Sequence, residues 1–209
     1  MTNWETFIVV AITLVLILGP FAAMIIAGLR HSKETYQVLY KAESFNNPWP
    51  QYFISLDIFF ASFFTILSGL IFSLTFDLKI GPSSIPDWCV YALLYTIVLM
   101  ILSLSGYIFS LTINYWEYTK DVILTFDPKT KTIFVRTASC EYVLHEDDMK
   151  EAEIFTNDNY KLPFLYYRFR LQNGEELLLT GHTKGVLGIF EYFKKIPQNY
   201  HKQFFPIIT

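Results

Sequence analysis

The side chains of this chain that are able to do chemistry are few and scattered. Residues 145–148 (HEDD) offer imidazole and carboxylate ligands to a metal ion, and His182 follows a glycine further along. A metal centre or a catalytic base needs such groups at spacings that aim them at one point, and no such spacing is present. The glycines of the C-terminal third also miss the pattern of a phosphate-binding loop. We therefore expect no enzymatic activity, no catalytic residue, no metal site and no cofactor.

Asp57 is the one acid in a long apolar run, residues 53–76. A carboxylate inside a lipid bilayer is costly and often marks an ion or proton pathway. Asp57 lies about one helical turn from the start of the run, near Trp49 and Tyr52, where its side chain reaches interfacial water. We predict Asp57 as an intramembrane polar residue, with ion coupling as the alternative to a purely structural role.

The charged residues are concentrated in the second half of the 209-residue chain. Hydrophobic residues make up 53% of the sequence and form long runs before Tyr115, whereas the part from Glu117 onward holds 12 of the 16 Lys and Arg and 13 of the 19 Asp and Glu. The net charge of that part, 12 − 13 = −1, argues against nucleic-acid binding. Cys89 lies in an apolar run and Cys140 in the polar part, so both are expected to be free thiols.

Three apolar runs are long enough to cross a bilayer. Residues 7–29, 53–76 and 90–113 each reach the roughly 20 residues that a helix needs to span about 30 Å of hydrocarbon. The four tryptophans flank these runs, as indole rings at a membrane interface do. Small residues around Gly69 and Gly106 recur at helical spacing, which indicates a seam between the second and third helices. The sequence thus predicts a three-helix transmembrane domain, residues 1–116.

The positive charges of the short loops predict the orientation. The loop between the first two spans carries Arg30, Lys33 and Lys41, whereas the loop before the third span has only Lys79. Lys and Arg are enriched in cytoplasmic loops of membrane proteins. We expect the N-terminus outside, and the first loop and the C-terminal domain in the cytoplasm.

From Asp121 onward the pattern changes to short alternating segments. Asn173-Gly174 is typical of a two-residue hairpin turn in which both residues have positive φ. A helix is expected in TKGVLGIFEYFKK, with Thr183 as its cap. The second domain, residues 117–209, is therefore predicted to be an antiparallel α+β module closed by a C-terminal helix. Its predicted strands are VILTFDP, TIFVR, CEYVLH, EAEIFT, LYYRFRL and ELLLT.

Residues 121–195 resemble the bacterial pleckstrin-homology-like (PH-like) domains that are found beside transmembrane helices. The resemblance is carried by FDPKTKTIFV, EYVLHEDDMKEAEIF and YRFRLQNGEELLLTG. It implies a β-barrel-like scaffold that binds proteins or lipids without enzymatic activity, in a bacterial inner (cytoplasmic) membrane. Lys129 and Lys131 occupy a turn comparable to the one that binds lipid headgroups in eukaryotic PH domains, so they are the candidate headgroup site.

Two groups of residues are the candidates for partner binding. Tyr166, Arg168 and Arg170 alternate on the face of their strand that points away from the apolar residues. Phe204 and Phe205 lie in an apolar C-terminal tail, which either packs back on the module or docks on a partner or the membrane surface.

We therefore expect a non-enzymatic, membrane-anchored binding protein whose cytoplasmic PH-like domain recognises a protein partner. The partner is either an antibacterial toxin, which would make the chain an immunity protein, or a membrane complex. The alternatives are an accessory or regulatory subunit of a transporter or channel and a lipid-sensing module that binds membrane lipids.

Overall fold

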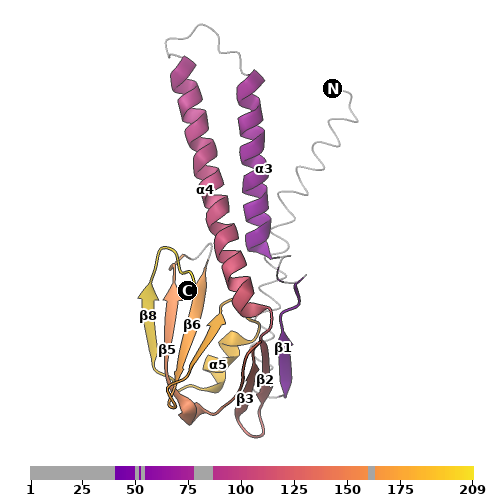
Figure 1. Ribbon diagram of the computed structural model, residues 1–209, viewed down its shortest axis with the longest axis vertical. Helices are drawn as coiled ribbons and strands as arrows, with labels where there is room; N and C mark the ends of the chain where they lie inside the picture. The colour runs from indigo at the N-terminus through magenta and orange to yellow at the C-terminus, as the bar shows by residue number, and fades with distance from the viewer. Residues whose placement is uncertain (1–40, 50–51, 53–54, 78–86, 160–162) are drawn as a thin grey trace. The chain divides into compact units, whose positions relative to one another are not determined.

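The computed structural model describes residues 41–49, 52, 55–77, 87–159 and 163–209. They belong to two compact units: a helical unit, within Phe53–Asn114, and a sheet unit, which joins the described residues before Phe53 to those of Tyr115–Thr209. Figure 1 shows the two helices of the first and the strands of the second. The predicted first span, residues 7–29, lies outside the described residues, as do Arg30, Lys33 and Lys79.

The helical unit consists of α3 (Leu56–Asp77) and α4 (Asp87–Thr119), except for the last turn of α4, which belongs to the sheet unit. In α4, Trp88–Thr119 is long and apolar enough to cross a membrane by length and composition, whereas the apolar stretch of α3, Asp57–Ser73, is shorter. The structure therefore supports one of the three predicted spans. Large apolar side chains are exposed along both helices: Ile66, Leu70, Phe72, Phe76, Leu93, Leu99, Met100 and Ile113.

The two helices contact each other through hydroxyl groups. The Ser105 hydroxyl donates to the Ala61 carbonyl oxygen at 2.8 Å, and its Oγ lies 2.7 Å from Thr65 Oγ1. Ala61 and Ser105 are buried. The glycines expected at this seam are not at close approaches, because a Cβ added at Gly69 or Gly106 would meet nothing within 4 Å. Hydroxyl hydrogen bonds and a contact between the rings of Phe72 and Tyr95, and not close packing at glycine, thus join α3 and α4.

The sheet unit contains two four-stranded sheets. In the first, neighbouring strands are antiparallel and follow the order β1 (Glu43–Asn46), β2 (Ile123–Asp127), β3 (Thr132–Arg136), β4 (Glu141–Leu144). The second has the order β7 (Glu176–Thr180), β6 (Leu165–Leu171), β5 (Met149–Thr156), β8 (Gln198–Lys202), and within it the β5–β8 pair is parallel. The short helix α5 (Val186–Tyr192) connects β7 to β8. The six strands predicted between residues 122 and 180 are confirmed.

One hydrophobic core lies between the two sheets and α5. Alternate residues of β2, β3, β6 and β7 belong to it, as the period of two requires, whereas all residues of β8 are exposed. Phe126 and Ile133 come from the first sheet and Phe169 and Leu179 from the second, and all four are fully buried. Ile189 of α5 is also fully buried, so the helix covers the core that the strands enclose.

Strand β1 comes from the chain before both helices, in a segment for which the sequence predicts a loop. Its register with β2 places Phe45 opposite Leu124, and Phe45 joins the core. Asn47, which follows β1, is buried; its side-chain N–H donates to the Val122 carbonyl oxygen at 3.3 Å, and its side-chain oxygen accepts from the Lys184 N–H at 3.0 Å. In chain order, therefore, the two helices are an insertion between neighbouring strands of one sheet.

Two local predictions were wrong. Of Asn173 and Gly174, only Gly174 has a positive φ, 88°. The Gly174 N–H donates to the Leu171 carbonyl oxygen, and the Leu171 N–H donates to the Glu175 carbonyl oxygen. These bonds close a three-residue loop and not a two-residue turn. The residue that caps α5 is Gly185, with φ 80°, and the Thr183 hydroxyl is used elsewhere.

Candidate functional site

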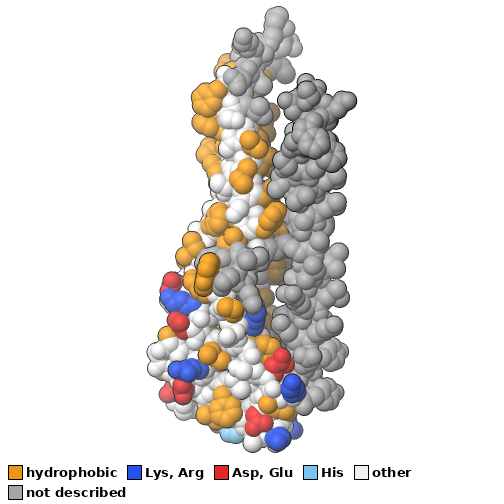
Figure 2. Space-filling model, turned by 90° about the vertical axis from the view of Figure 1, so that its right-hand side faces the viewer, with side chains coloured by type: hydrophobic (Ala, Val, Ile, Leu, Met, Phe, Trp, Pro, Cys, Tyr) orange, Lys and Arg blue, Asp and Glu red, His pale blue; other side chains and the backbone are white. Residues whose placement is uncertain are grey.

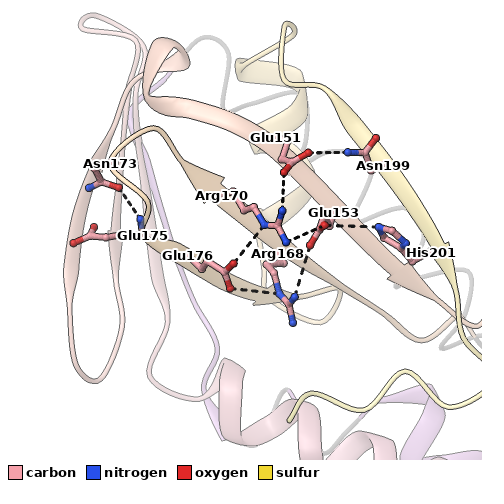
Figure 3. Close-up of polar contacts among 9 residues, drawn as sticks. All are labelled: Glu151, Glu153, Arg168, Arg170, Asn173, Glu175, Glu176, Asn199 and His201. Carbon is pink, nitrogen blue, oxygen red and sulfur yellow. Dashed lines mark hydrogen bonds and ion pairs between the residues drawn. The ribbon is translucent and has the colours of Figure 1, made fainter.

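An ion-pair network covers the face of the second sheet that points away from the core (Figure 3). Arg170 lies at its centre: Nη1 is 3.0 Å from Glu151 Oε1, Nη2 is 3.3 Å from Glu153 Oε1, and Nε is 3.4 Å from Glu176 Oε1. Arg168 pairs with Glu153 and Glu176, each at 3.7 Å. The pKa of Arg170 lies above its ordinary value, first because of the hydrogen bond to Glu151 and then because of the charge of Glu153. The predicted arginines are therefore engaged within the chain.

The fourth strand of this sheet completes the network. Asn199 on β8 donates its side-chain N–H to Glu151 at 2.8 Å, and His201 Nε2 lies 3.9 Å from Glu153. His201 also stacks on the Phe155 ring, with the ring centroids 4.8 Å apart. Side chains of β5, β6, β7 and β8 thus meet on one face, where the charges of arginines and glutamates largely cancel.

Tyr166 is buried in the structure, with only 4% of its surface exposed. Its ring stacks on Phe155 at 4.7 Å between centroids and meets the edge of Tyr115, in the last turns of α4. Burial raises the pKa of the Tyr166 hydroxyl. The alternation that placed Tyr166 opposite the core residues of β6 was right, and Tyr115 and Phe155 pack against its ring, so its contact with a partner stays a prediction.

The C-terminal tail is partly folded onto the sheet unit. Residues 198–202 form β8, and the Tyr115 hydroxyl donates to the Pro206 carbonyl oxygen at 2.8 Å. Ile208 is buried, whereas Phe204 is 88% exposed and Phe205 much less so. Of the two predicted tail residues, Phe204 thus offers the larger apolar surface to a partner.

The lysine turn is organised by Asp127 and lies after the second strand of its sheet, not after the first. Asp127 Oδ1 accepts the Lys129 N–H at 3.0 Å, and Oδ2 accepts the Thr130 hydroxyl at 2.9 Å. These two bonds lower the pKa of Asp127, and the bond from the Lys129 N–H has the larger effect. Lys131 has φ 53°, in the left-handed region that closes a tight turn. The carboxylate offsets the lysine charges here, and the connection after the first strand is the helical insertion.

Asp57 and residues 145–148 lie at the ends of secondary-structure elements. Asp57 belongs to the first turn of α3. His145 donates its backbone N–H to Asp148 Oδ2 at 2.8 Å, and Glu146 Oε1 accepts the Lys195 N–H at 2.9 Å. These two bonds hold the short 3-10 turn between β4 and β5. Among the described residues, no group of three or more His, Cys, Asp and Glu is placed to hold a metal ion.

A groove between the edge strands β4 and β7 was not predicted from the sequence. It consists of two adjoining cavities of about 350 and 240 Å³ that share Tyr142. All of β4 lines the first cavity, and the first half of β7 lines the second. In the sequence, the only indication of this groove is the set of acidic residues near the ends of these strands. Whether these residues lie close together depends on which strands form the edges of the sheets. The acidic residues that line the groove are Glu117, Asp121, Glu141, Asp148, Glu175 and Glu176.

Replacing Glu153 with glutamine should reveal how much the network stabilises the sheet. The side chain of Glu153 is only 13% exposed and faces both arginines, so Glu153→Gln is expected to lower the free energy of unfolding by about 1 kcal/mol, and less at high salt. The measurement is urea unfolding of the full chain in detergent, with pulse proteolysis as the readout. The matched control is Glu141→Gln, whose pair with Arg136 is exposed on both sides and should contribute almost nothing. Equal effects of the two changes would contradict a stabilising network.

Comparison with known proteins identifies the architecture. The PH domain family matches residues 47–181 of the 209, a segment that includes both α3 and α4. No curated protein and no solved structure matches. Strand β1 ends just before the matched segment, the helical insertion and strands β2–β7 fill it, and α5 and β8 follow it. The chain belongs to the PH domain family, whose members bind proteins or lipids.

Proposed function

We propose that this chain is a non-enzymatic binding protein, anchored in a bacterial inner membrane, whose cytoplasmic PH domain recognises a protein partner. The observation that carries the proposal is an apolar helical insertion within the PH domain itself. Only 17% of the most apolar part of α4 is buried, and Leu99 and Met100 in its middle are 64% and 68% exposed. Apolar surface of this extent is unfavourable in water, and a bilayer would cover it.

The distribution of charge supports the same assignment. On the face shown in Figure 2, hydrophobic side chains cover the described part of the helices, and charged side chains gather over the strands. This is the distribution expected when lipid surrounds the helices and water surrounds the strands. The orientation with the PH domain in the cytoplasm rests on the positive charges of the first loop.

Protein recognition is favoured over lipid recognition by the charges of the domain. Lipid-binding sites attract anionic headgroups with clusters of Lys and Arg. Here Asp127 closes the turn that carries Lys129 and Lys131, and the groove is acidic. Arg168 and Arg170 are paired with glutamates. Such a surface repels anionic lipid and suits a protein partner.

The anchoring is tested by extracting membranes from cells that make the full chain. We expect the chain to stay in the membrane fraction at alkaline pH and to require detergent for release. A variant with Leu99→Arg and Met100→Arg should lose insertion, since each arginine near a helix centre costs about 2.5–3.5 kcal/mol. The control is Leu187→Arg with Tyr200→Arg, which places the same charges at exposed positions of the PH domain. Release of the unaltered chain by alkali alone would refute the anchor.

The partner is tested by gentle detergent purification of the tagged full chain, with cross-linking and mass spectrometry. One polypeptide in near-stoichiometric amount is the expected result. A transporter or channel subunit would instead identify the chain as its accessory, and Asp57→Asn would then be the variant to assay for ion flux. Recovery of lipid without protein would rule against protein recognition and favour the lipid sensor.

A specific form of this function is immunity against a membrane-associated antibacterial toxin. It is motivated by the combination of a small membrane anchor with a binding domain. We expect a neighbouring gene whose product kills cells unless this chain is made with it. If no neighbouring gene is toxic, the immunity form fails, while the wider proposal of a protein partner keeps its own test.

A further inference from the structure

The edge strands β4 and β7 flank the groove without pairing across it. β4 pairs with β3 and β7 pairs with β6, and the sheets of the described residues give neither strand a second neighbour. The whole of β4, residues 141–144, lines one cavity of the groove. An edge strand presents a row of backbone N–H and C=O groups with which another extended chain can pair.

The charges that line the two cavities of the groove are of one sign. Six carboxylates line these cavities, and no Lys, Arg or His does. A third cavity, of about 530 Å³, adjoins the second at Asp121 and is also lined by Lys120 and Arg136. Three of the six have cationic neighbours: Glu117 has Lys120, Glu141 has Arg136, and Glu176 has the two arginines of the network. The other three make no ion pair within the described part of the chain: Asp121, Asp148 and Glu175.

The groove also has apolar surface between its charges. Val143 is exposed in the lining of the first cavity, and Leu178 is partly exposed in the lining of the second. Tyr142 joins the two cavities, and burial is the main reason for the raised pKa of its hydroxyl. A chain that alternates basic and apolar residues would place its two kinds of side chain against the carboxylates and the apolar surface.

We propose that this groove binds an extended, Lys- or Arg-bearing segment of the partner protein, which adds to β4 as a further strand. The proposal rests on the proposed function and names the chemistry of the partner. Backbone pairing with β4 supplies binding energy that does not depend on sequence, and the carboxylates select a basic segment over an acidic one. The paired arginines of the second sheet take no part in it.

The test uses the full chain in detergent and a labelled synthetic peptide in which lysine alternates with valine. We expect this peptide to bind, and the same peptide with glutamate in place of lysine to bind about tenfold more weakly or worse. A third peptide, with the lysine sequence but methylated backbone nitrogens, should also bind about tenfold more weakly because it cannot pair with β4. Equal affinity of the glutamate peptide would overturn the charge selection, and equal affinity of the methylated peptide would overturn strand addition.

Two variants locate the site. Glu175→Lys reverses a charge in the exposed turn beside the groove and should weaken binding of the lysine peptide by about tenfold. Glu191→Lys makes the same change at an exposed position of α5 that does not line the groove, and should leave binding almost unchanged. Equal effects of the two variants would exclude the groove as the site. If the Glu175→Lys chain still retains its cellular partner in the purification above, the groove proposal fails while the proposed function stands.

Discussion

Replacing Gly185 with alanine is expected to lower the free energy of unfolding by about 3 kcal/mol. Gly185 has φ 80°, a conformation that costs a residue with a Cβ about 1–2 kcal/mol. A Cβ at this position would also lie 2.6 Å from Phe45 Cδ2, and overpacking of a core costs about 1–3 kcal/mol. The Phe45 ring cannot withdraw freely, because it is buried and packs edge-on against Phe126. Urea unfolding of the full chain in detergent, followed by pulse proteolysis, measures the change.

Two control variants separate the conformational cost from the packing cost. Gly174 has a similar φ, 88°, but a Cβ there would meet nothing within 4 Å, so Gly174→Ala should have only the conformational cost of about 1–2 kcal/mol. In a chain that already carries Phe45→Ala, the added Gly185→Ala change should also cost only about 1–2 kcal/mol, since the clash is gone. If Gly185→Ala costs the same with and without Phe45, the contact between β1 and the start of α5 contributes nothing.

The strands that follow α4 could be predicted because the residue pattern that identifies each strand lies within the strand and its flanking turns. They are short apolar or alternating segments, and turn residues such as Asp127-Pro128 and Asn173-Gly174 separate them. β1 has neither property: it is four residues long, and Phe45 is its one buried residue. The residue opposite Phe45 is Leu124, on the far side of two helices in the chain, so no local pattern could reveal the pairing.

The site was predicted in part for the same reason. Alternation along β6 placed Arg168 and Arg170 on the face away from the core, and they lie there. The register between β5 and β6 sets Glu151 opposite Arg170 and Glu153 opposite Arg168. This register depends on both strands, so the sequence of one strand alone does not predict it. The groove depends on the strand order of both sheets, because β4 and β7 are both edge strands. The charged residues of the second sheet could therefore be predicted from the sequence, but their pairing with glutamates could not.

Replacing Thr180 with valine should lower the free energy of unfolding by about 2 kcal/mol, because it breaks a buried chain of three hydroxyls. The Thr119 hydroxyl donates its single hydrogen to the Tyr115 carbonyl at 2.7 Å, so Thr180, 2.5 Å away, must donate to Thr119. Thr183 must then donate to Thr180, at 3.3 Å. All three threonines are buried, and this chain of bonds joins the last turn of α4 to β7. Urea unfolding with pulse proteolysis again measures the change.

The order of the donors gives this prediction a sharp control. Thr180→Val leaves the Thr183 hydroxyl hydrogen without an acceptor, and an unsatisfied buried donor costs about 1–3 kcal/mol. The double variant Thr180→Val with Thr183→Val removes that donor, so it should be more stable than Thr180→Val alone, although it carries one more substitution. Thr119 keeps its bond to Tyr115 in both variants. If the double variant is instead less stable than the single one, the hydroxyls are not ordered in this way and the end of α4 is held on β7 by packing alone.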